Sequence, residues 1–508
     1  MKTNFKIYTV LIITGIILSA CGGSTNRSST TGWDYNDSDN GGFEYVEYFE
    51  QETGPGLVLI EGGSFSMGRT EQDVLYEWNS IPRRVTVSSF YMDETEVRNV
   101  DYREYLYWLK RVFLDYPEVH HNALPDTLVW RSKLAWNEPY VELYLRHPSY
   151  QEYPIVGVTW GQANDYCAWR TNRVNEWILI REGLLLDNPN QQAEDNFDTD
   201  AYLAGQYEGA MKSPGIPDLD PNNDYRKVRM EDGILLPRYR LPTEAEWEFA
   251  ALGLIGNSID ERVYNRRLYP WNGHYIRNDG EKHRGTIMAN HVRGRGDYMG
   301  TAGALNDNAD VTAPVDSYWP NDYGLYCMAG NVNEWVMDVY RPLSFQDDDE
   351  FRPFRGNVFQ TQERDEEGNI YEKDTLGKIK WRDVGETDIL GNPHKDEAFN
   401  RRNYNQADNI NYMDGDFNSS IFYNDQDKSA KSSSTDLYDQ GKPAEGKRGG
   451  IGMTSMINDN ARVYKGGSWH DRTYWLSPGT RRFLDETQRQ ADLGFRCAMV
   501  RVGSPVGF

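Results

Sequence analysis

Cysteine is scarce in this 508-residue chain. Only four occur, and none forms a Cys-x-x-Cys pair, which excludes a disulfide scaffold and a zinc site built on that motif. Positive charge is also short, with 54 Lys and Arg against 78 Asp and Glu and a formal net charge of −24. Nucleic acid is therefore not an expected partner, because binding phosphates needs a basic face. A basic protein partner is not excluded.

Long apolar runs are missing too, apart from one at the start of the chain. A mainly apolar run of 14 residues spans positions 7–20, which is too short for a membrane span of about 20 residues and is typical of a signal peptide at residues 1–20. Residues 18–21 read Leu-Ser-Ala-Cys and resemble a bacterial lipobox. This predicts cleavage before Cys21 and a diacylglyceryl group on its sulfur. The alternative is an ordinary signal peptide with an incidental cysteine.

The tract that follows the cysteine contains almost no apolar side chains. Residues 22–32 are mainly Gly, Ser and Thr, so we expect residues 21–50 to form a flexible lipidated tether. No later stretch is long and apolar enough to cross a bilayer. The lipid is therefore the only membrane anchor that the sequence predicts.

Short strands are predicted near the start of the folded part. Residues 57–68 contain an apolar strand, a Gly-Gly turn and an alternating strand, a pattern that predicts a hairpin. Residues 84–92 predict a further strand. Residues 154–160 predict a strand that runs into a helix.

Helical signals accompany them. Asn99 opens a segment with Tyr102, Leu106 and Leu109 at helical spacing. Thr243 and Glu246 have the spacing of a capping box, which predicts a helix start. Three polar segments, residues 114–152, 181–238 and 341–448, are predicted to be insertions. The absence of alternating βαβ units predicts an α+β fold. Residues 51–508 are expected to form a single domain that carries these insertions.

Seven blocks in order along the chain carry a resemblance. Together they resemble the formylglycine-generating-enzyme (sulfatase-modifying factor) family, which implies a fold related to C-type lectins. The blocks are LVLIEGGSFSMG (57–68), FYMDETEVRN (90–99), PIVGVTWGQANDYCAW (154–169), RLPTEAEWEFA (240–250), TAPVDSYWPNDYGLYCMAGNVNEWVMD (312–338), YKGGSW (464–469) and GFRCA (494–498).

The resemblance implies where catalytic residues would stand. The enzymes of the family use two copper-binding Cys, three and eight residues after the Ser of the Gly-Gly-Ser block. Counted from Ser468, these positions hold Asp471 and Leu476. Soft Cu(I) needs thiolates, so we predict that this chain is a pseudoenzyme. The neighbouring His470 is interpreted as a loop residue.

Structural calcium is the other metal that the resemblance implies, and no cofactor is predicted to be required. One site would use the carbonyls of Gly330 and Val332 with the Glu334 carboxylate, although Cys327 stands where the family has Asn or Asp. The ligands of a second site would be Asn290, the His291 carbonyl, Asp307 and the Ala309 carbonyl. Oxygen ligands of these kinds suit Ca²⁺.

The resemblance also implies a disulfide. In the family, the Cys of the helix after Val-x-Trp pairs with the Cys of the Gly-Phe-Arg-Cys block, which gives Cys167 and Cys497 here. An oxidising periplasm would preserve such a bond. Cys327 would stay unpaired. The alternative is that all three are buried free thiols.

Residues inside the insertions carry a narrower resemblance. Residues 52–56, 105–110, 123–131 and 146–150 resemble the gliding-motility lipoproteins of Bacteroidota. This implies a noncatalytic lipoprotein on the periplasmic face of the outer membrane, a structural component of the gliding and type IX secretion machinery. Its partners would be other envelope proteins of that complex, including a GldK-like lipoprotein. The alternatives are a Ca²⁺-dependent glycan or peptide receptor on the same fold and a residual oxidase.

Overall fold

The computed structural model describes the chain from residue 27 to residue 503, with gaps. The described residues are 27–40, 42–69, 74–76, 79–253, 267–271, 274–292, 309, 311–340, 354, 356, 360–365, 367–383 and 460–503. Cys21, Asp307 and most of the third predicted insertion lie outside them.

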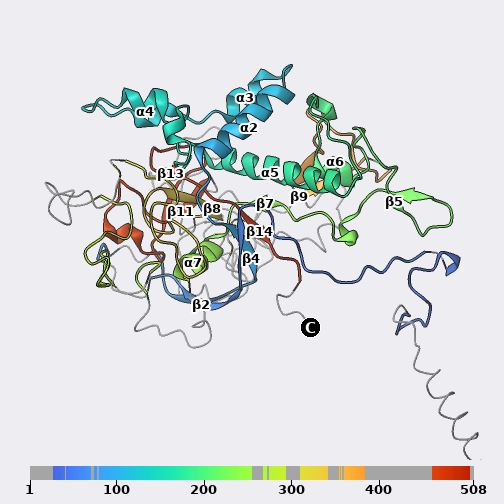
Figure 1. Cartoon of the computed structure of the whole chain (residues 1–508), viewed down its shortest axis with the longest axis horizontal. Helices are drawn as coiled ribbons and strands as arrows, with labels where there is room; N and C mark the ends of the chain where they lie inside the picture. The colour runs from blue at the N-terminus through green and yellow to red at the C-terminus, as the bar shows by residue number, and fades with distance from the viewer. Residues whose placement is uncertain are drawn as a thin grey trace, which may run out of the picture.

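The first sheet joins segments from both ends of the domain. Its antiparallel strands follow the order β1-β4-β14-β7, and their bounds are Leu57–Ile60, Phe90–Asp93, Ala498–Val500 and Tyr239–Arg240. Successive side chains of a strand point to opposite faces, so Tyr91 packs with α2 (Asn99–Val112) and α5 (Trp160–Arg181). Phe90 and Met92 instead pack with α7 (Glu244–Leu252). The sheet thus lies between two helical layers (Figure 1).

The second sheet has the order β12-β11-β8-β13, with bounds Arg482–Asp485, Ala461–Lys465, Asn333–Val339 and Leu493–Gly494. Its strands pair antiparallel except β13, which runs parallel to β8. As a result, the end of β11 lies beside the starts of the other three strands.

The predicted hairpin at residues 57–68 is wrong, although both of its strands exist. β1 pairs with β4, whereas β2 (Gly63–Met67) pairs with β3 (Arg83–Val87). The single strand predicted at residues 84–92 is accordingly two strands. Alternation fixes which face a strand buries but not its partner. All four strands contribute to one apolar cluster.

The strand predicted at residues 154–160 is also absent. Pro154 forms only an isolated bridge with Arg98. The next amides bond to loops instead, because Ile155 donates to the carbonyl of Val97 and Gly157 to that of Gln490. The helix after it is as predicted.

Helix starts were predicted more reliably. α2 begins at Asn99, and α7 has the capping box predicted at Thr243. Thr159 caps α5 with a second complete box, which was not predicted. None of the helices in the described ranges is long and apolar enough to cross a membrane.

Two of the predicted insertions are packed rather than loose. Residues 114–152 form α3 (Pro117–Ala123), α4 (Glu138–Leu143) and the 3₁₀ turns η2 (Thr127–Trp130) and η3 (Pro148–Tyr150). Residues 181–238 surround a small apolar core that includes Phe197, Tyr202 and Tyr207. Their elements are η4 (Ala193–Asp195), α6 (Thr199–Leu203), β5 (Ile216–Pro217), β6 (Tyr225–Arg226) and η5 (Met230–Asp232).

The remaining described elements are η1 (Ser38–Asn40), β9 (Gln360–Gln362), β10 (Trp381–Asp383) and η8 (Thr473–Leu476). The end of the predicted tether contacts the domain. Glu44 pairs with Arg226, and Glu50 lies 3.2 Å from Arg501. The part of the tether that the structure describes is therefore not free along its whole length.

Candidate functional site

One end of the second sheet gathers polar side chains from all four of its strands. Asn333 begins β8, Arg482 begins β12, Asp492 directly precedes β13, and Ser468 follows β11 by three residues. A tight turn leads to Ser468. Gly467 has φ +71°, and a Cβ there would lie 2.9 Å from the Trp475 carbonyl oxygen, so this position favours glycine.

Hydrogen bonds join these residues and Asp471 into one network. The buried Ser468 Oγ lies 2.7 Å from Asp471 Oδ2 and 2.9 Å from Asp492 Oδ2. Asn333 Nδ2 donates to both carboxylates. Arg482 donates to both oxygens of Asp471 at 2.7 Å and also to Asn333 Oδ1. Arg482 is therefore the direct cationic partner of Asp471.

The two carboxylates differ in acidity. Burial raises the pKa of Asp492, and the charge of Asp471 raises it further. Burial tends to raise the pKa of Asp471 as well, but the hydrogen bonds and charge of Arg482 outweigh burial, so the pKa of Asp471 is lowered. Since one hydroxyl has a single proton to donate, Ser468 cannot donate to both. A proton on Asp492 would satisfy all three groups, with Asp492 donating to Ser468 and Ser468 to Asp471.

The second predicted catalytic position lies in the core. Leu476, in η8, is fully buried in a cluster with Tyr269, Ala289 and Ala329. Asp471 is held by Arg482. Neither side chain supplies a thiolate, so these residues do not fit the Cu(I) of the family's enzymes.

The first insertion packs over the loop that carries Ser468. Trp469 stacks on Trp130 of η2, with ring centroids 6.1 Å apart and planes 20° from parallel. Val141 and Tyr144 of the insertion belong to the same cluster, as does Val332 at the edge of β8. The insertion is therefore part of the wall of the polar network.

The first predicted calcium set has other partners. Both oxygens of Glu334 accept hydrogen bonds from Arg496 at 2.7 Å, and Trp247 Nε1 donates to Oε2. Glu334 and Arg496 are fully buried. Cys327 Sγ donates to the Val315 carbonyl. Glu334 is thus held in an ion pair, and the calcium site stays a prediction.

The structure places the second calcium set beside the first. The Asn290 carbonyl accepts from the amide of Asn331, next to Gly330, and Asn290 Nδ2 donates to the Val311 carbonyl. The buried His291 Nδ1 lies 2.9 Å from the Ala289 carbonyl. Ala309 is described but Asp307 is not. Within the described ranges, no three His, Cys, Asp or Glu gather as a metal site.

The predicted disulfide partners are neighbours. Cys167 Sγ and Cys497 Sγ lie 3.4 Å apart, and both residues are buried. They are free thiols in this structure, as is the buried Cys327. Burial raises the pKa of Cys497 well above its ordinary value, which disfavours the reactive thiolate. The disulfide stays a prediction.

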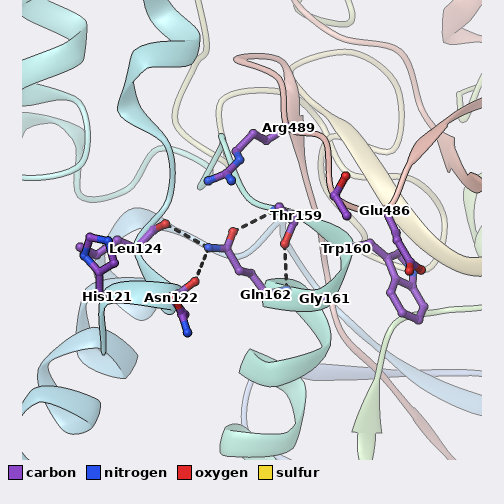
Figure 2. Close-up of a pocket in the computed structure, with 10 residues that line it drawn as sticks. His121, Asn122, Leu124, Thr159, Trp160, Gly161, Gln162, Glu486 and Arg489 are labelled. Atoms are coloured by element: carbon purple, nitrogen blue, oxygen red, sulfur yellow. Dashed lines mark hydrogen bonds between the residues drawn. The ribbon is translucent and has the colours of Figure 1, made fainter. Parts of the chain in front are cut away.

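A cavity of about 490 Å³ is lined in part by the loop that connects β12 to Asp492. Figure 2 shows its lining, which comes from the end of α3, the start of α5 and residues of this loop, including Glu486 and Arg489. Gln162 is one of the lining residues. The Gln162 amide is satisfied, since it accepts from Thr159 N and donates to the carbonyls of Asn122 and Leu124. These contacts serve to hold α3 against α5.

A match to a known protein family identifies the family of this chain. The profile of the sulfatase-modifying factor enzyme 1-like domain (FGE-sulfatase) matches residues 42–383. The chain belongs to this family. Its mixed α+β fold, with few helices and short strands, is the one expected from the resemblance.

Curated relatives include active and inactive proteins. Over 299 residues the chain is 26% identical to the formylglycine-generating enzyme of Mus musculus, an alignment that covers 56% of this chain and 58% of the relative. The bacterial enzyme of Thermomonospora curvata is 36% identical over 305 residues, 58% of this chain and 75% of the relative. The inactive C-alpha-formylglycine-generating enzyme 2 of Bos taurus is 25% identical over 320 residues, 59% and 75% respectively. The chain thus spans little more than half of the mouse enzyme.

Sequence reasoning missed three members of the network, namely Asn333, Arg482 and Asp492. Asn333 lies inside one recognised block, and Asp492 lies two residues before another. A signal was available, because polar residues at strand ends beside these blocks are candidates for a site. The strand pairing that brings them together could not be predicted from their positions in the sequence.

Proposed function

We propose that this chain is a noncatalytic member of the family that serves as a structural envelope lipoprotein. The observation that carries the proposal is the pair Asp471 and Leu476. Where the enzymes hold two copper-binding cysteines, this chain has an arginine-paired carboxylate and a fully buried aliphatic side chain.

Within that class, the proposed role is that of a GldJ-type gliding-motility lipoprotein, a component of the gliding and type IX secretion machinery. The lipobox-like Cys21 and the insertion residues that resemble these lipoproteins support it. The proposed location is the periplasmic face of the outer membrane, and the proposed partners are other envelope proteins, including a GldK-like lipoprotein.

The packing of the first insertion supports a binding role over catalysis. A site for an extended substrate peptide must leave the reacting residues accessible, yet Leu476 at the second catalytic position is fully buried, and Trp469 of the same loop packs on Trp130. A fold that has lost its chemistry can still provide surfaces for partners. The insertion supplies such a surface.

Catalysis is tested by oxygen uptake with a Cys-containing peptide and Cu(I). We expect no uptake above the blank, with the Thermomonospora curvata enzyme as the positive control. Peptide oxidation by this chain at a comparable rate would contradict the proposal.

The envelope role is tested separately. Cys21→Ala should release the protein into the soluble fraction or trap its precursor, whereas the wild type should sediment with outer membranes. Pull-down from solubilised envelopes followed by mass spectrometry should recover gliding or secretion proteins with the wild type. Cleavage and unchanged sedimentation of the Cys21→Ala protein would refute lipid anchoring.

A further inference from the structure

We propose that the loop of residues 131–137, which precedes α4, is a membrane-insertion loop that contacts an anionic lipid surface. The proposal rests on the proposed lipid anchoring, which would hold the domain close to a bilayer.

Two apolar side chains project from this loop. Leu134 and Trp136 are 101% and 80% exposed, the two highest values among the large hydrophobic residues that the structure describes as exposed. Only a few positions away, Trp130 is buried in the aromatic cluster. The loop therefore leaves two large apolar groups in water although the domain has a core close by.

The base of the loop is held firmly. Asn137 Nδ2 donates to the Trp130 carbonyl at 2.9 Å, and Arg131 pairs with Glu138 at 2.8 Å. A bridge between Ser132 and Ala135 closes a tight turn at the tip. Lys133 and Leu134 occupy the two central positions of this turn. The tip is thus presented by a fixed frame, and the insertion segment around α4 projects from the body of the molecule (Figure 1).

Charge favours a lipid surface as the occupant. An anionic membrane repels a chain of net charge −24, but Lys133 places a positive charge at the tip of this turn, whereas the charge of Arg131 is already paired with Glu138. A lysine at the headgroups, a leucine below them and a tryptophan at the boundary match the depth preferences of these side chains. The tip therefore combines one lysine with two highly exposed apolar side chains.

Because the domain would be tethered to the bilayer, even weak membrane binding by Leu134 and Trp136 would be enough to orient it. Two side chains bind a bilayer only marginally by themselves, and a covalent lipid raises their effective concentration at the surface. The loop would then set which side of the domain faces the membrane.

The experiment uses the acylated protein in vesicles of phosphatidylethanolamine and phosphatidylglycerol. An environment-sensitive fluorophore is attached through Ala135→Cys, since the three described native thiols are buried, and acyl-chain nitroxide lipids serve as quenchers. We expect a blue shift and quenching at position 135. Both should be lost when L134S and W136S are added, and neither should occur with the same fluorophore at the exposed Tyr275→Cys.

The outcomes separate the two proposals. The proposal that residues 131–137 enter the membrane would be overturned if the protein floats with the vesicles but quenching at position 135 is no greater than at position 275. A blue shift that requires added envelope proteins would also overturn it, because the loop would then bind protein. If the protein does not float, the lipid anchor fails. In that event the unacylated chain must still sediment with the vesicles, and L134S/W136S must abolish this binding without changing the melting temperature; otherwise the insertion loop is rejected as well.

Discussion

Two polar clusters of similar composition lie at different depths, one fully buried and one partly exposed. The deep cluster contains Arg496 with Glu334, and Glu96 close by. The shallow cluster is the network around Ser468, in which Arg482 faces Asp471, with Asp492 close by. Each has one arginine and two carboxylic acids.

The depth of each cluster affects the pKa of its second carboxylic acid, the one that is not paired with the arginine. Burial, with the charge of Glu334, raises the pKa of Glu96 well above its ordinary value, and Asn331 donates to both of its oxygens. In the shallow cluster, the Arg482 and Asp471 side chains keep 18% and 11% exposure. The second acid thus has a raised pKa in both clusters, and the shift is the larger one for the fully buried Glu96.

The largest expected effect comes from breaking the deep ion pair. Glu334→Gln leaves Arg496 buried without its charged partner, so we expect a loss of about 3–5 kcal/mol in the free energy of unfolding. Glu96→Gln is the matched control, since glutamine resembles a protonated glutamate, and it should cost less than about 1 kcal/mol. Urea denaturation measures both. Equal losses would mean that Glu96 is charged in the folded state.

Removing the wall of the shallow cluster should have the next largest effect. Trp130→Ala leaves a cavity against Trp469, and a buried tryptophan costs about 3 kcal/mol or more when truncated. Because water would then reach the network, the pKa of Asp492 should also fall towards its ordinary value. Denaturation and NMR titration measure the two effects.

The control for this prediction is Trp136→Ala. This residue lies in the same insertion but is exposed, and we expect a change within about 0.5 kcal/mol. If both variants lost the same stability, the insertion would be tied to the domain differently from the packing described.

Asp471→Asn should destabilise the protein by about 1–3 kcal/mol, because Arg482 loses a charge-assisted bidentate partner. The lowered pKa of Asp471 gives the sign of the pH dependence. Its contribution is present above the unfolded pKa and is lost as the pH falls through the lower folded value. In the variant this acid-side loss should shrink, and the pKa of Asp492 should fall because its charged neighbour is gone. A pKa of Asp492 that is the same in the variant as in the wild type would assign the shift to burial alone.

The helices were more predictable than the sheets for a physical reason. The caps of α5 and α7 lie within four residues of the helix starts that they fix, so the sequence shows them directly. The pairing of β1 with β4 joins residues that are 30 to 36 positions apart and depends on the burial of both faces. Alternating apolar residues give no information on that choice.

The residues of the candidate site likewise fall into those that the sequence could place and those that it could not. Ser468, Asp471 and Leu476 could be placed because they follow one recognisable block. Arg482 and Asp492 could not, because they reach the network only through the pairing of β12 and β13 with other strands. The apolar residues of the second insertion are spread among turns, which hid its small core.

The smallest effect is expected from Asp492→Asn, and its sign is opposite. The raised pKa of Asp492 means that its stabilising contribution is complete below the unfolded pKa and is lost as the pH rises through the folded value. Asparagine imitates the protonated acid at every pH, so the variant should equal or exceed the wild type at pH 7 by about 1 kcal/mol or less. The fall in wild-type stability that begins near the ordinary pKa of aspartate should be absent from the variant. Denaturation from pH 3 to 8 measures this, with the exposed Asp224→Asn as the control that keeps the wild-type profile. A loss of stability at pH 7 would show that Asp492 is charged and needed in that form, and the two clusters would then handle their second acid differently.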